Sequence, residues 1–274
     1  MPHGRLVCMA LAAGITAAAW GCDRSPAPRP SPIVPDATPA PSPSPPPAPT
    51  AKRLLVVTHT AGFRHSSIPV AEATLRDLGA ATGLFQTEFC RTGADVAARL
   101  TVDGLRQIDA VFFANTTGSL GIPDMGAFLD WIAAGHGFLG AHSASDTYHE
   151  SDAYLDMLGG EFATHGQIAE ADIRVDDPSD PSVAHLSPRF RVTDELYRFT
   201  RNRRSAVHVL LSMDRNPPDG VGDAGQASDL LMAWRKPFGG GRVFYTALGH
   251  REEVWQDPRF QQHLLGALRW ALGG

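Results

Sequence analysis

Cysteine is scarce in this sequence, and its scarcity excludes a disulfide framework. Cys8, Cys22 and Cys90 are the only cysteines among the 274 residues. The first two fall in an N-terminal leader, so Cys90 has no partner for an internal disulfide. Its apolar Phe-Cys context is typical of a residue that fills a core, and a nucleophilic thiol is the less typical alternative.

Compact motifs for binding metals and nucleotides are also absent. The sequence has no HExxH or CxxC pair and no Walker loop. No cofactor is therefore evident from local spacing. A divalent metal could still be held by histidines that only the fold brings together, namely His59, His65, His142, His165 and His250.

Basic patches are missing as well. The chain carries 24 Lys and Arg against 29 Asp and Glu, a net charge of −5, and no basic cluster is interleaved with aromatic residues. Attraction to a phosphate backbone needs such clusters. The sequence therefore predicts that nucleic acid is not a partner.

The N-terminus contains an export signal. Arg5 is a short positive region, and Leu6–Ala19 is an apolar run too short to span a bilayer. The following Ala19–Cys22 resembles a bacterial lipobox, although Trp20 stands where a small residue is usual. We predict that residues 1–21 are a signal peptide and that a lipid on Cys22 anchors the exported protein to a membrane, on the periplasmic or cell-surface side. Plain secretion is the alternative.

A proline-rich stretch separates this leader from the rest of the chain. Residues 25–50 contain 12 of the 22 prolines, interleaved with Ser and Ala. Such a composition cannot bury a core and favours an extended polyproline II conformation. We predict a disordered linker over 22–51 that tethers one domain over 52–274.

Within that domain, short apolar runs alternate with helical patterns. The expected strands are 53–58, 84–90, 110–114, 138–141, 168–175, 207–213, 230–234 and 242–247, and the expected helices are 68–78, 96–100, 123–134 and 260–272. This alternation predicts an α/β fold, a mostly parallel sheet with helices on both faces. The strands after Gly160 should extend the same sheet, interrupted by a loop over 216–228.

The segment Gly135–Thr147 predicts a sharp turn between a strand and a helix-compatible stretch. The apolar run Phe138–Ala141 stops at His142, within the spacing Gly-x-His-x-Ala. This is the spacing of a nucleophile elbow, with histidine in the place of the nucleophile. His142 could be a general base, a nucleophile or a metal ligand, or it could be a structural residue that caps the turn.

Polar clusters follow four of the predicted strands. Because the carboxyl ends of parallel strands meet at one edge of the sheet, these clusters should converge in one concave pocket. The expected catalytic residues are His142, Asp146 and His250. The expected substrate-binding residues in these clusters are His59, Arg64, His65, Asn115, Thr117 and Ser143, the last of which could instead be an N-cap.

Two further candidates come from the second half of the chain. His165 lies in an expected loop, and Asp194-Glu195 places two carboxylates beside the aromatic Tyr197. Carboxylates next to an aromatic ring suit the recognition of sugar hydroxyls. We expect His165 and Glu195 to close the pocket as substrate-binding residues, and the alternative for Asp194-Glu195 is an exposed acidic strand edge.

An ordered series of segments resembles the trehalose-utilisation (ThuA-like) family. The matching segments include THTAGFRHSSI at 58–68, DAVFFANTTG at 109–118, GHGFLGAHSASDT at 135–147, LGGEFATHG at 158–166, TDELYRF at 193–199 and GGGRVFYTALGH at 239–250. The resemblance covers nearly all of 52–274. It implies the flavodoxin-like sheet of the class I glutamine amidotransferases.

The resemblance also implies a function in carbohydrate utilisation. Amidotransferases carry a cysteine at the elbow and a late His-x-Glu pair, whereas this chain has His142 at the elbow and keeps the late pair as His250-Arg251-Glu252. The missing cysteine speaks against a glutaminase. We therefore expect an enzyme, a hydrolase, lyase or isomerase, that processes trehalose, another disaccharide or a keto-sugar. The alternative is a non-catalytic carbohydrate-binding module tethered to the cell surface.

Overall fold

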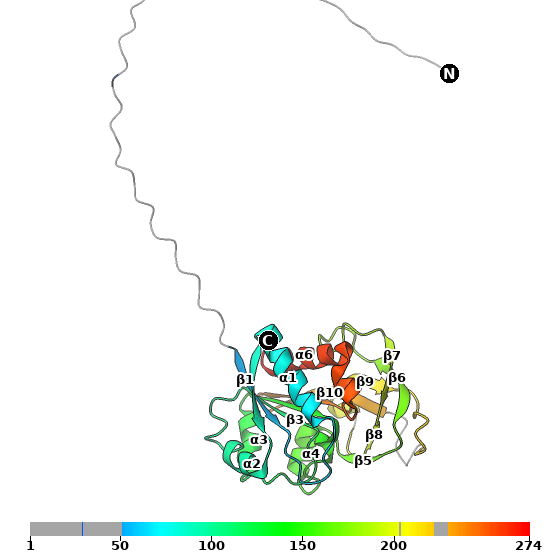
Figure 1. Ribbon diagram of the computed structural model, residues 1–274, viewed down its shortest axis with the longest axis horizontal. Helices are drawn as coiled ribbons and strands as arrows, with labels where there is room; N and C mark the ends of the chain where they lie inside the picture. The colour runs from blue at the N-terminus through cyan, green and yellow to red at the C-terminus, as the bar shows by residue number, and fades with distance from the viewer. Residues whose placement is uncertain (1–28, 30–50, 203, 222–229) are drawn as a thin grey trace, which may run out of the picture. The chain divides into compact units, whose positions relative to one another are not determined.

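The apolar runs of the first half and one late run lie side by side in a single sheet (Figure 1). The computed structural model describes Arg29 and residues 51–202, 204–221 and 230–274. The nine strands follow the order β2-β1-β3-β4-β11-β10-β9-β6-β7. The strands are β1 (Lys52–Val57), β2 (Phe85–Cys90), β3 (Ala110–Ala114), β4 (Gly137–Ala141), β6 (Ala169–Val175), β7 (Arg189–Asp194), β9 (His208–Met213), β10 (Leu230–Phe238) and β11 (Gly241–Thr246).

The first five strands of that order are parallel. β1 pairs with β2 and β3, and β4 pairs with β3 and β11, for instance with Phe138 opposite Val243. If β11 is counted as the fifth parallel strand, their order is 2-1-3-4-5, which is the strand order of the flavodoxin-like fold. All residues of β3 and β4 are buried, as expected for strands covered on both faces. The prediction of a mostly parallel α/β sheet is confirmed.

The other strands of the sheet are antiparallel and come from the second half. β10 pairs with β11 and β9, and β6 pairs with β9 and β7. The sequence predicts β6, β9 and β10 but misses β7, which alternates apolar with charged or polar residues. It also misses a separate two-stranded sheet of β5 (Phe162–His165) and β8 (Tyr197–Phe199). His165 thus ends a strand and does not lie in a loop, because β5 pairs with β8.

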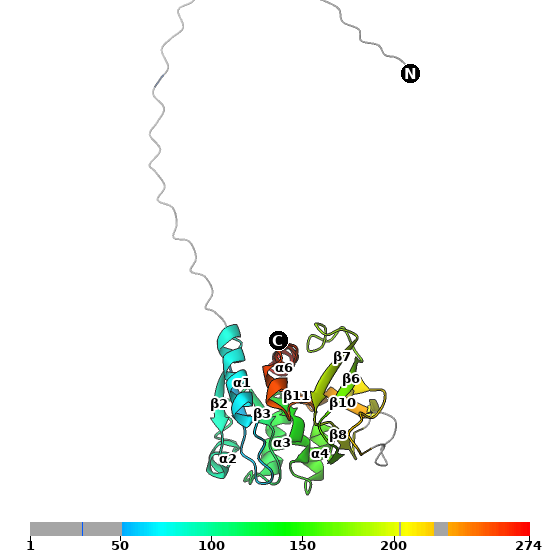
Figure 2. The same ribbon diagram turned by 45° about the vertical axis from the view of Figure 1, so that its right-hand side comes forward.

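Helices cover the parallel part in two groups (Figures 1 and 2). One group packs α1 against α5 and α6, and the other packs α3 against α4; β11 contacts members of both. The helices are α1 (Ile68–Thr82), α2 (Gly93–Arg99), α3 (Met125–Ala133), α4 (Asp152–Leu158), α5 (Glu252–Gln256) and α6 (Pro258–Ala271), with 3₁₀ turns η1 (His142–Asp146) and η2 (Arg204–Ala206). The helix-compatible stretch after β4 is therefore only a 3₁₀ turn.

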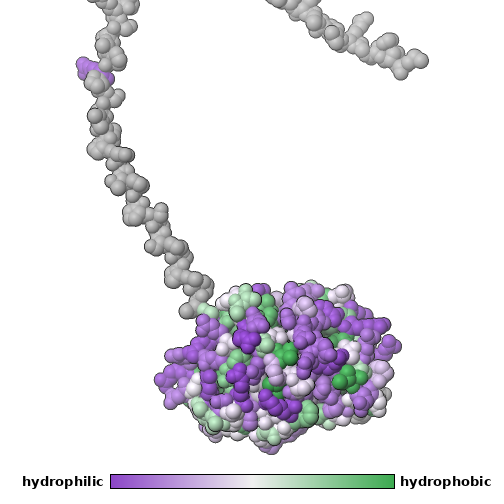
Figure 3. Space-filling model, in the orientation of Figure 1, coloured by the Kyte–Doolittle hydropathy of each residue, from purple (hydrophilic) through white to green (hydrophobic). Residues whose placement is uncertain are grey.

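The described fold belongs to one compact unit, Pro49–Gly274. Its face in Figure 3 is mostly hydrophilic, with small apolar patches. The predicted signal peptide, Cys22 and the proline-rich linker lie outside the described residues, as does 222–229 of the expected loop; its described part, 216–221, contains no helix or strand. None of the described helices has both the length and the apolar character needed to cross a bilayer.

Candidate functional site

The site is built around His142, the first residue after β4. Its backbone is left-handed, with a φ of 48°. This conformation is uncommon for a residue with a side chain and costs about 1–3 kcal/mol, which the surrounding structure must supply. A Cβ on Gly140 would lie 3.0 Å from the Cβ of Ala144, so the turn is as tight as the elbow spacing predicts.

Hydrogen bonds from buried side chains hold this turn in place. The Tyr245 hydroxyl donates to the His142 carbonyl at 2.6 Å, and the Ser145 hydroxyl contacts both groups. The His142 Nδ1 lies 3.0 Å from the Ala247 carbonyl. Because a carbonyl can only accept, Nδ1 carries the proton, and the lone pair of the neutral ring is on Nε2.

His250 lies on the loop after β11, and this loop is held at Gly249. The Gly249 carbonyl accepts hydrogen bonds from the Asn115 amide at 2.8 Å and the Trp255 indole at 2.7 Å. The buried Asp194 carboxylate accepts the backbone N–H groups of Gly249, at 2.7 Å, and of Arg251, at 3.1 Å. These bonds fix the backbone on both sides of His250.

His65 reaches the site from the loop after β1. The Thr117 hydroxyl donates to the Phe63 carbonyl at 2.8 Å, which fixes the loop two residues before His65. The His65 Nδ1 lies 3.4 Å from the Ser143 hydroxyl, and its ring meets the His142 ring edge to face at 4.9 Å between centroids. Ser143 therefore lies inside η1 and points to His65.

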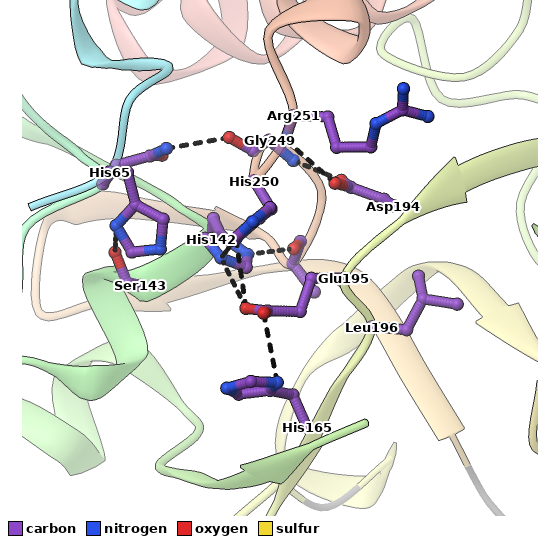
Figure 4. Close-up of polar contacts among 12 residues, drawn as sticks. His65, His142, Ser143, His165, Asp194, Glu195, Leu196, Gly249, His250 and Arg251 are labelled. Carbon is purple, nitrogen blue, oxygen red and sulfur yellow. Dashed lines mark hydrogen bonds and ion pairs between the residues drawn. The ribbon is translucent and has the colours of Figure 1, made fainter. Parts of the chain in front are cut away.

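Glu195 joins these histidines from the second half of the chain (Figure 4). Its Oε2 lies 3.4 Å from the His142 Nε2 and 3.1 Å from the His250 Nδ1. Its Oε1 lies 3.1 Å from the His165 Nδ1. The Tyr197 ring packs on His142, with 4.1 Å between centroids. We refer to His65, His142, Glu195 and His250 as the His/Glu cluster.

The cluster is mostly shielded from water. The His142 side chain is fully buried, whereas His250 and His165 are 23% and 43% exposed. Water therefore reaches the cluster from the side of these two residues. The two carboxylates expected at an exposed acidic edge are instead buried, so that alternative is wrong.

Burial and mutual contacts shift the titration of the cluster. Burial, with the nearby His142 and His250, lowers the pKa of His65 to about 3. Burial opposes ionisation of Glu195, yet the neighbouring His142 and His250 hold its pKa well below the usual range. Burial likewise opposes the charged form of His250, but Glu195 raises its pKa overall. At neutral pH the cluster thus combines a neutral imidazole with a carboxylate.

The structure does not bring all sequence-selected residues into this cluster. His59 lies near Gly93 at the start of α2, and Arg64 is exposed and donates to the Thr58 carbonyl. Asp146 lies 2.7 Å from the His149 Nε2 on the surface. Asn115 and Thr117 contact the loops that carry His250 and His65, so they position the cluster without joining it.

Sequence reasoning missed several residues of the site. The carboxylate beside His250 is Glu195, whereas Glu252 of the late His-x-Glu pair is exposed at the start of α5. Asp194 was considered only as a carboxylate for sugar hydroxyls, whereas it holds the His250 loop, and Tyr245, which holds the His142 turn, was not selected. Tyr245 reads as an ordinary core residue of an apolar strand, and no local pattern could have singled it out.

The cluster can support two kinds of chemistry. Imidazoles next to a carboxylate can transfer protons at a bound substrate. The same donor atoms, nitrogen and carboxylate oxygen, are also those that bind divalent transition metals. A cysteine-dependent reaction has no support here: Cys90, the free cysteine among the described residues, is buried, and burial raises its pKa to about 12.

Comparison with known proteins places this chain in a family. A family model described as trehalose utilisation (ThuA) matches residues 53–271. A ThuA-like protein from Parabacteroides merdae has a similar structure, with a TM-score of 0.65, 18% identity, and coverage of 82% of this chain and 91% of that one. One from Bacteroides uniformis gives a TM-score of 0.62, 19% identity, and coverage of 84% and 95%.

The fold also recurs within larger enzymes. A β-galactosidase from Bacillus circulans sp. alkalophilus has a TM-score of 0.53 and 12% identity, with coverage of 81% of this chain and 31% of that one. At such identities the likeness concerns the fold alone. A search of curated proteins found no match.

Proposed function

Because this chain belongs to the trehalose-utilisation (ThuA) family, we propose that it is an enzyme that processes a disaccharide or an oxidised, keto derivative of one. The observation that carries the proposal is the convergence of three imidazoles and a carboxylate around the strained turn at His142. Strain of this kind is kept where the site needs it. A structural role for His142 as a cap of the turn would not explain why His65, Glu195 and His250 lie around its ring.

The chemistry proposed is proton transfer next to a sugar carbonyl. An imidazole removes the proton from the carbon beside the carbonyl, and the electron pair moves onto the carbonyl oxygen to give an enediolate. The proton of the adjacent hydroxyl passes to that oxygen, and the carbon-bound proton returns at the former carbonyl carbon, so isomerisation needs no other reactant. His142, through its Nε2, is the candidate base, and Glu195 and His165 are candidate partners for sugar hydroxyls.

The test is an assay of purified protein with trehalose, other disaccharides and their keto derivatives in D₂O, followed by NMR. His142→Asn is the informative variant, because asparagine tolerates left-handed backbone. His208→Asn is the matched control, since His208 is an exposed histidine at the start of β9 that pairs with Asp177. We expect turnover and deuterium uptake in wild type and in His208→Asn, and loss of both in His142→Asn. Equal turnover in all three would overturn the proposed role of the cluster.

A carbohydrate-binding module is the second candidate, and one observation favours it. The Phe63 side chain is 67% exposed and meets His65 edge to face at 4.9 Å between centroids. An exposed aromatic ring at the rim of a polar site can act as a stacking platform for a sugar. Sugar binding that Phe63→Ala weakens, with no turnover in any variant, would favour the module over the enzyme.

Export and lipid attachment at Cys22 remain part of the proposal. They rest on the leader and the proline-rich segment of the sequence. Replacement of Cys22 by Ala should move the protein from the membrane fraction to the soluble fraction. Mass spectrometry of the membrane-extracted wild type should find Cys22 as a lipidated first residue, and an unmodified N-terminus elsewhere would leave only plain secretion.

A further inference from the structure

Three electron-pair donors face one another at the centre of the cluster. The His142 Nε2 is 3.3 Å from the His250 Nδ1 and 3.4 Å from the Glu195 Oε2, and the last two atoms are 3.1 Å apart. One nitrogen of His65 completes a set of four ligand atoms that all lie within 4.8 Å of one another. His65 contacts Ser143 through Nδ1, so its Nε2 is the nitrogen left for a ligand.

Protons alone satisfy this arrangement poorly. The ring proton of a neutral His142 is committed to the Ala247 carbonyl, so its Nε2 presents a lone pair to a carboxylate oxygen. Two lone pairs repel unless a positive charge stands between them. A proton on the His250 Nδ1 reaches the His142 Nε2 and the Glu195 Oε2, but it leaves those two atoms facing each other at 3.4 Å. A cation at the centre would supply the positive charge for all of them at once.

We propose that the His/Glu cluster is a binding site for a divalent transition-metal ion. Metal–ligand bonds of ~2.0–2.1 Å in a tetrahedron place neighbouring ligand atoms ~3.3–3.4 Å apart. The three distances among His142, His250 and Glu195 are 3.1–3.4 Å. These three residues thus form one face of a metal site, with His65 as the fourth ligand.

The ligand set indicates the class of metal. Three imidazoles and one carboxylate suit zinc, or iron and its neighbours in the same row. Calcium and magnesium prefer oxygen ligands throughout, so they fit this site poorly. The set contains no thiolate, since the described cysteine, Cys90, is at the end of β2 and belongs to the hydrophobic core.

The residues around the ligands orient them as metal sites require. A ligating histidine usually donates its other ring proton to a carbonyl or carboxylate. His142 does so to Ala247, and the Glu195 Oε1 faces the His165 Nδ1, which leaves Oε2 for the metal. The backbone of His250 is fixed through Asp194. A preformed site of this kind needs little rearrangement to bind an ion.

This inference deepens the proposed function, on which its catalytic use rests. A metal at the cluster would take the lone pair of His142 and, by expanding to five-coordination, would accept the sugar carbonyl as a fifth ligand and polarise it in place of an imidazole. His165 is outside the ligand set and faces the exposed side of the site. It would then be the imidazole that accepts the proton.

The test is metal binding by tag-free protein, stripped with a chelator and titrated with Zn²⁺ in a calorimeter and with Co²⁺ in a spectrophotometer. We expect one equivalent bound and visible Co²⁺ absorption typical of four- or five-coordinate nitrogen and oxygen ligation. His142→Asn and Glu195→Gln should weaken binding at least ~100-fold, as loss of a direct ligand should exceed the ~10–100-fold cost of losing an outer partner. Circular dichroism checks that both variants are folded, and Glu195→Gln keeps the side-chain shape.

His208→Asn is again the control. His208 belongs to a second group of possible ligands, with Asp177 and Asp180, and the control shows whether that group takes up the metal. Stoichiometric binding that survives in His208→Asn and is lost in both cluster variants supports the inference. Absence of stoichiometric binding by wild type, or binding indifferent to both cluster variants, overturns it.

The two proposals fail in different ways. Metal binding lost in the cluster variants, with no sugar converted by the loaded protein, would retain the metal site and reject the enzyme. Sugar turnover that depends on His142, in wild type that binds no stoichiometric metal, would retain the enzyme and reject the metal site.

Discussion

Two buried histidines of this protein are anchored in the same way but differ in their backbone conformation and in the surroundings of the second ring nitrogen. His142 and His263 are 0% and 2% exposed, and in each the Nδ1 lies 3.0 Å from a backbone carbonyl, that of Ala247 or of Ser182. In both, therefore, the proton is on Nδ1 and the lone pair is on Nε2. Burial and tautomer alone do not distinguish a site residue from a core residue.

The difference is in what the second nitrogen meets. The His263 ring lies beside Phe244 and Phe260 in the core, and its Nε2 has no hydrogen-bond partner among the described residues. The His142 Nε2 meets Glu195 and His250. His263 is also in ordinary helix, whereas His142 is in strained backbone. A charged partner and backbone strain together set His142 apart as the candidate functional residue.

The largest effect should come from the functional histidine. We expect His142→Asn to reduce kcat on a keto-disaccharide by ~10²–10⁴-fold, the range typical of a lost acid–base group. The free energy of unfolding should change by no more than about 1–2 kcal/mol, because asparagine fits the left-handed backbone at this position. Steady-state kinetics and urea unfolding measure the two quantities. If His142→Asn mainly unfolds the protein, His142 has a structural role, and the distinction from His263 is wrong.

Removal of the core histidine should have the opposite pattern. His263→Ala leaves a cavity beside Phe244 and Phe260, and we expect a loss of about 2–4 kcal/mol of stability. The kcat of the folded protein should stay near that of wild type. Urea unfolding and kinetics below the unfolding transition check this, and a stable variant without turnover would contradict it.

The same histidine should make stability depend on pH. Burial lowers the pKa of His263 from 6.5 to about 4. The unfolded chain then binds the proton more readily than the folded one, so this contribution is fully present above pH 6.5 and is lost as the pH falls towards 4. At ~1.4 kcal/mol per pKa unit, the loss reaches about 3 kcal/mol. Urea unfolding at pH 7.5 and 4.5 should show a smaller difference for His263→Leu than for wild type; an equal difference would mean that other groups cause it.

The sequence predicts the parallel part of the fold better than the site. β3 and β4 are uninterrupted apolar runs, and β1 and β11 become apolar after their first two residues, a pattern that follows directly from burial on both faces. β7 and β8 carry charged residues within their runs, so neither has the pattern of a buried strand. The site residues divide in the same way, into those that follow predicted strands and those that do not.

Candidate residues next to strands could be named from the sequence, but their partners could not. Asp146 is nearer to His142 in the chain than Glu195 is, yet the Asp146 carboxylate contacts His149 and Glu195 meets the His142 ring. The choice between the two carboxylates is made by the path of β7 into β8, which no local pattern encodes. For the same reason His59 and Arg64 follow β1 directly but point elsewhere.

A moderate effect is expected from Asp194→Asn. The Asp194 carboxylate accepts two backbone N–H groups beside His250. An amide replaces one acceptor with a donor and sets it against an N–H, which should cost about 1–3 kcal/mol of stability. We expect kcat to fall about tenfold as the His250 loop loosens. Thermal unfolding and kinetics measure both, and unchanged kcat despite lower stability would show that the loop keeps its place without Asp194.

The smallest effect separates support of His142 from support of its neighbour. Tyr245 and Tyr154 are both fully buried under the same turn, and their hydroxyls donate to the carbonyls of His142 and Ala144 at 2.6 and 2.8 Å. Loss of either hydroxyl should cost about 1 kcal/mol of stability. Tyr245→Phe should in addition lower kcat several-fold, because the strained backbone of His142 loses the hydrogen bond to its carbonyl. Tyr154→Phe should leave kcat unchanged, since Ala144 has no part in the chemistry. Equal losses of kcat in the two variants would mean that the turn responds as one unit. The position of His142 would then depend on the packing of the whole turn, and not on the Tyr245 hydroxyl that donates to its carbonyl.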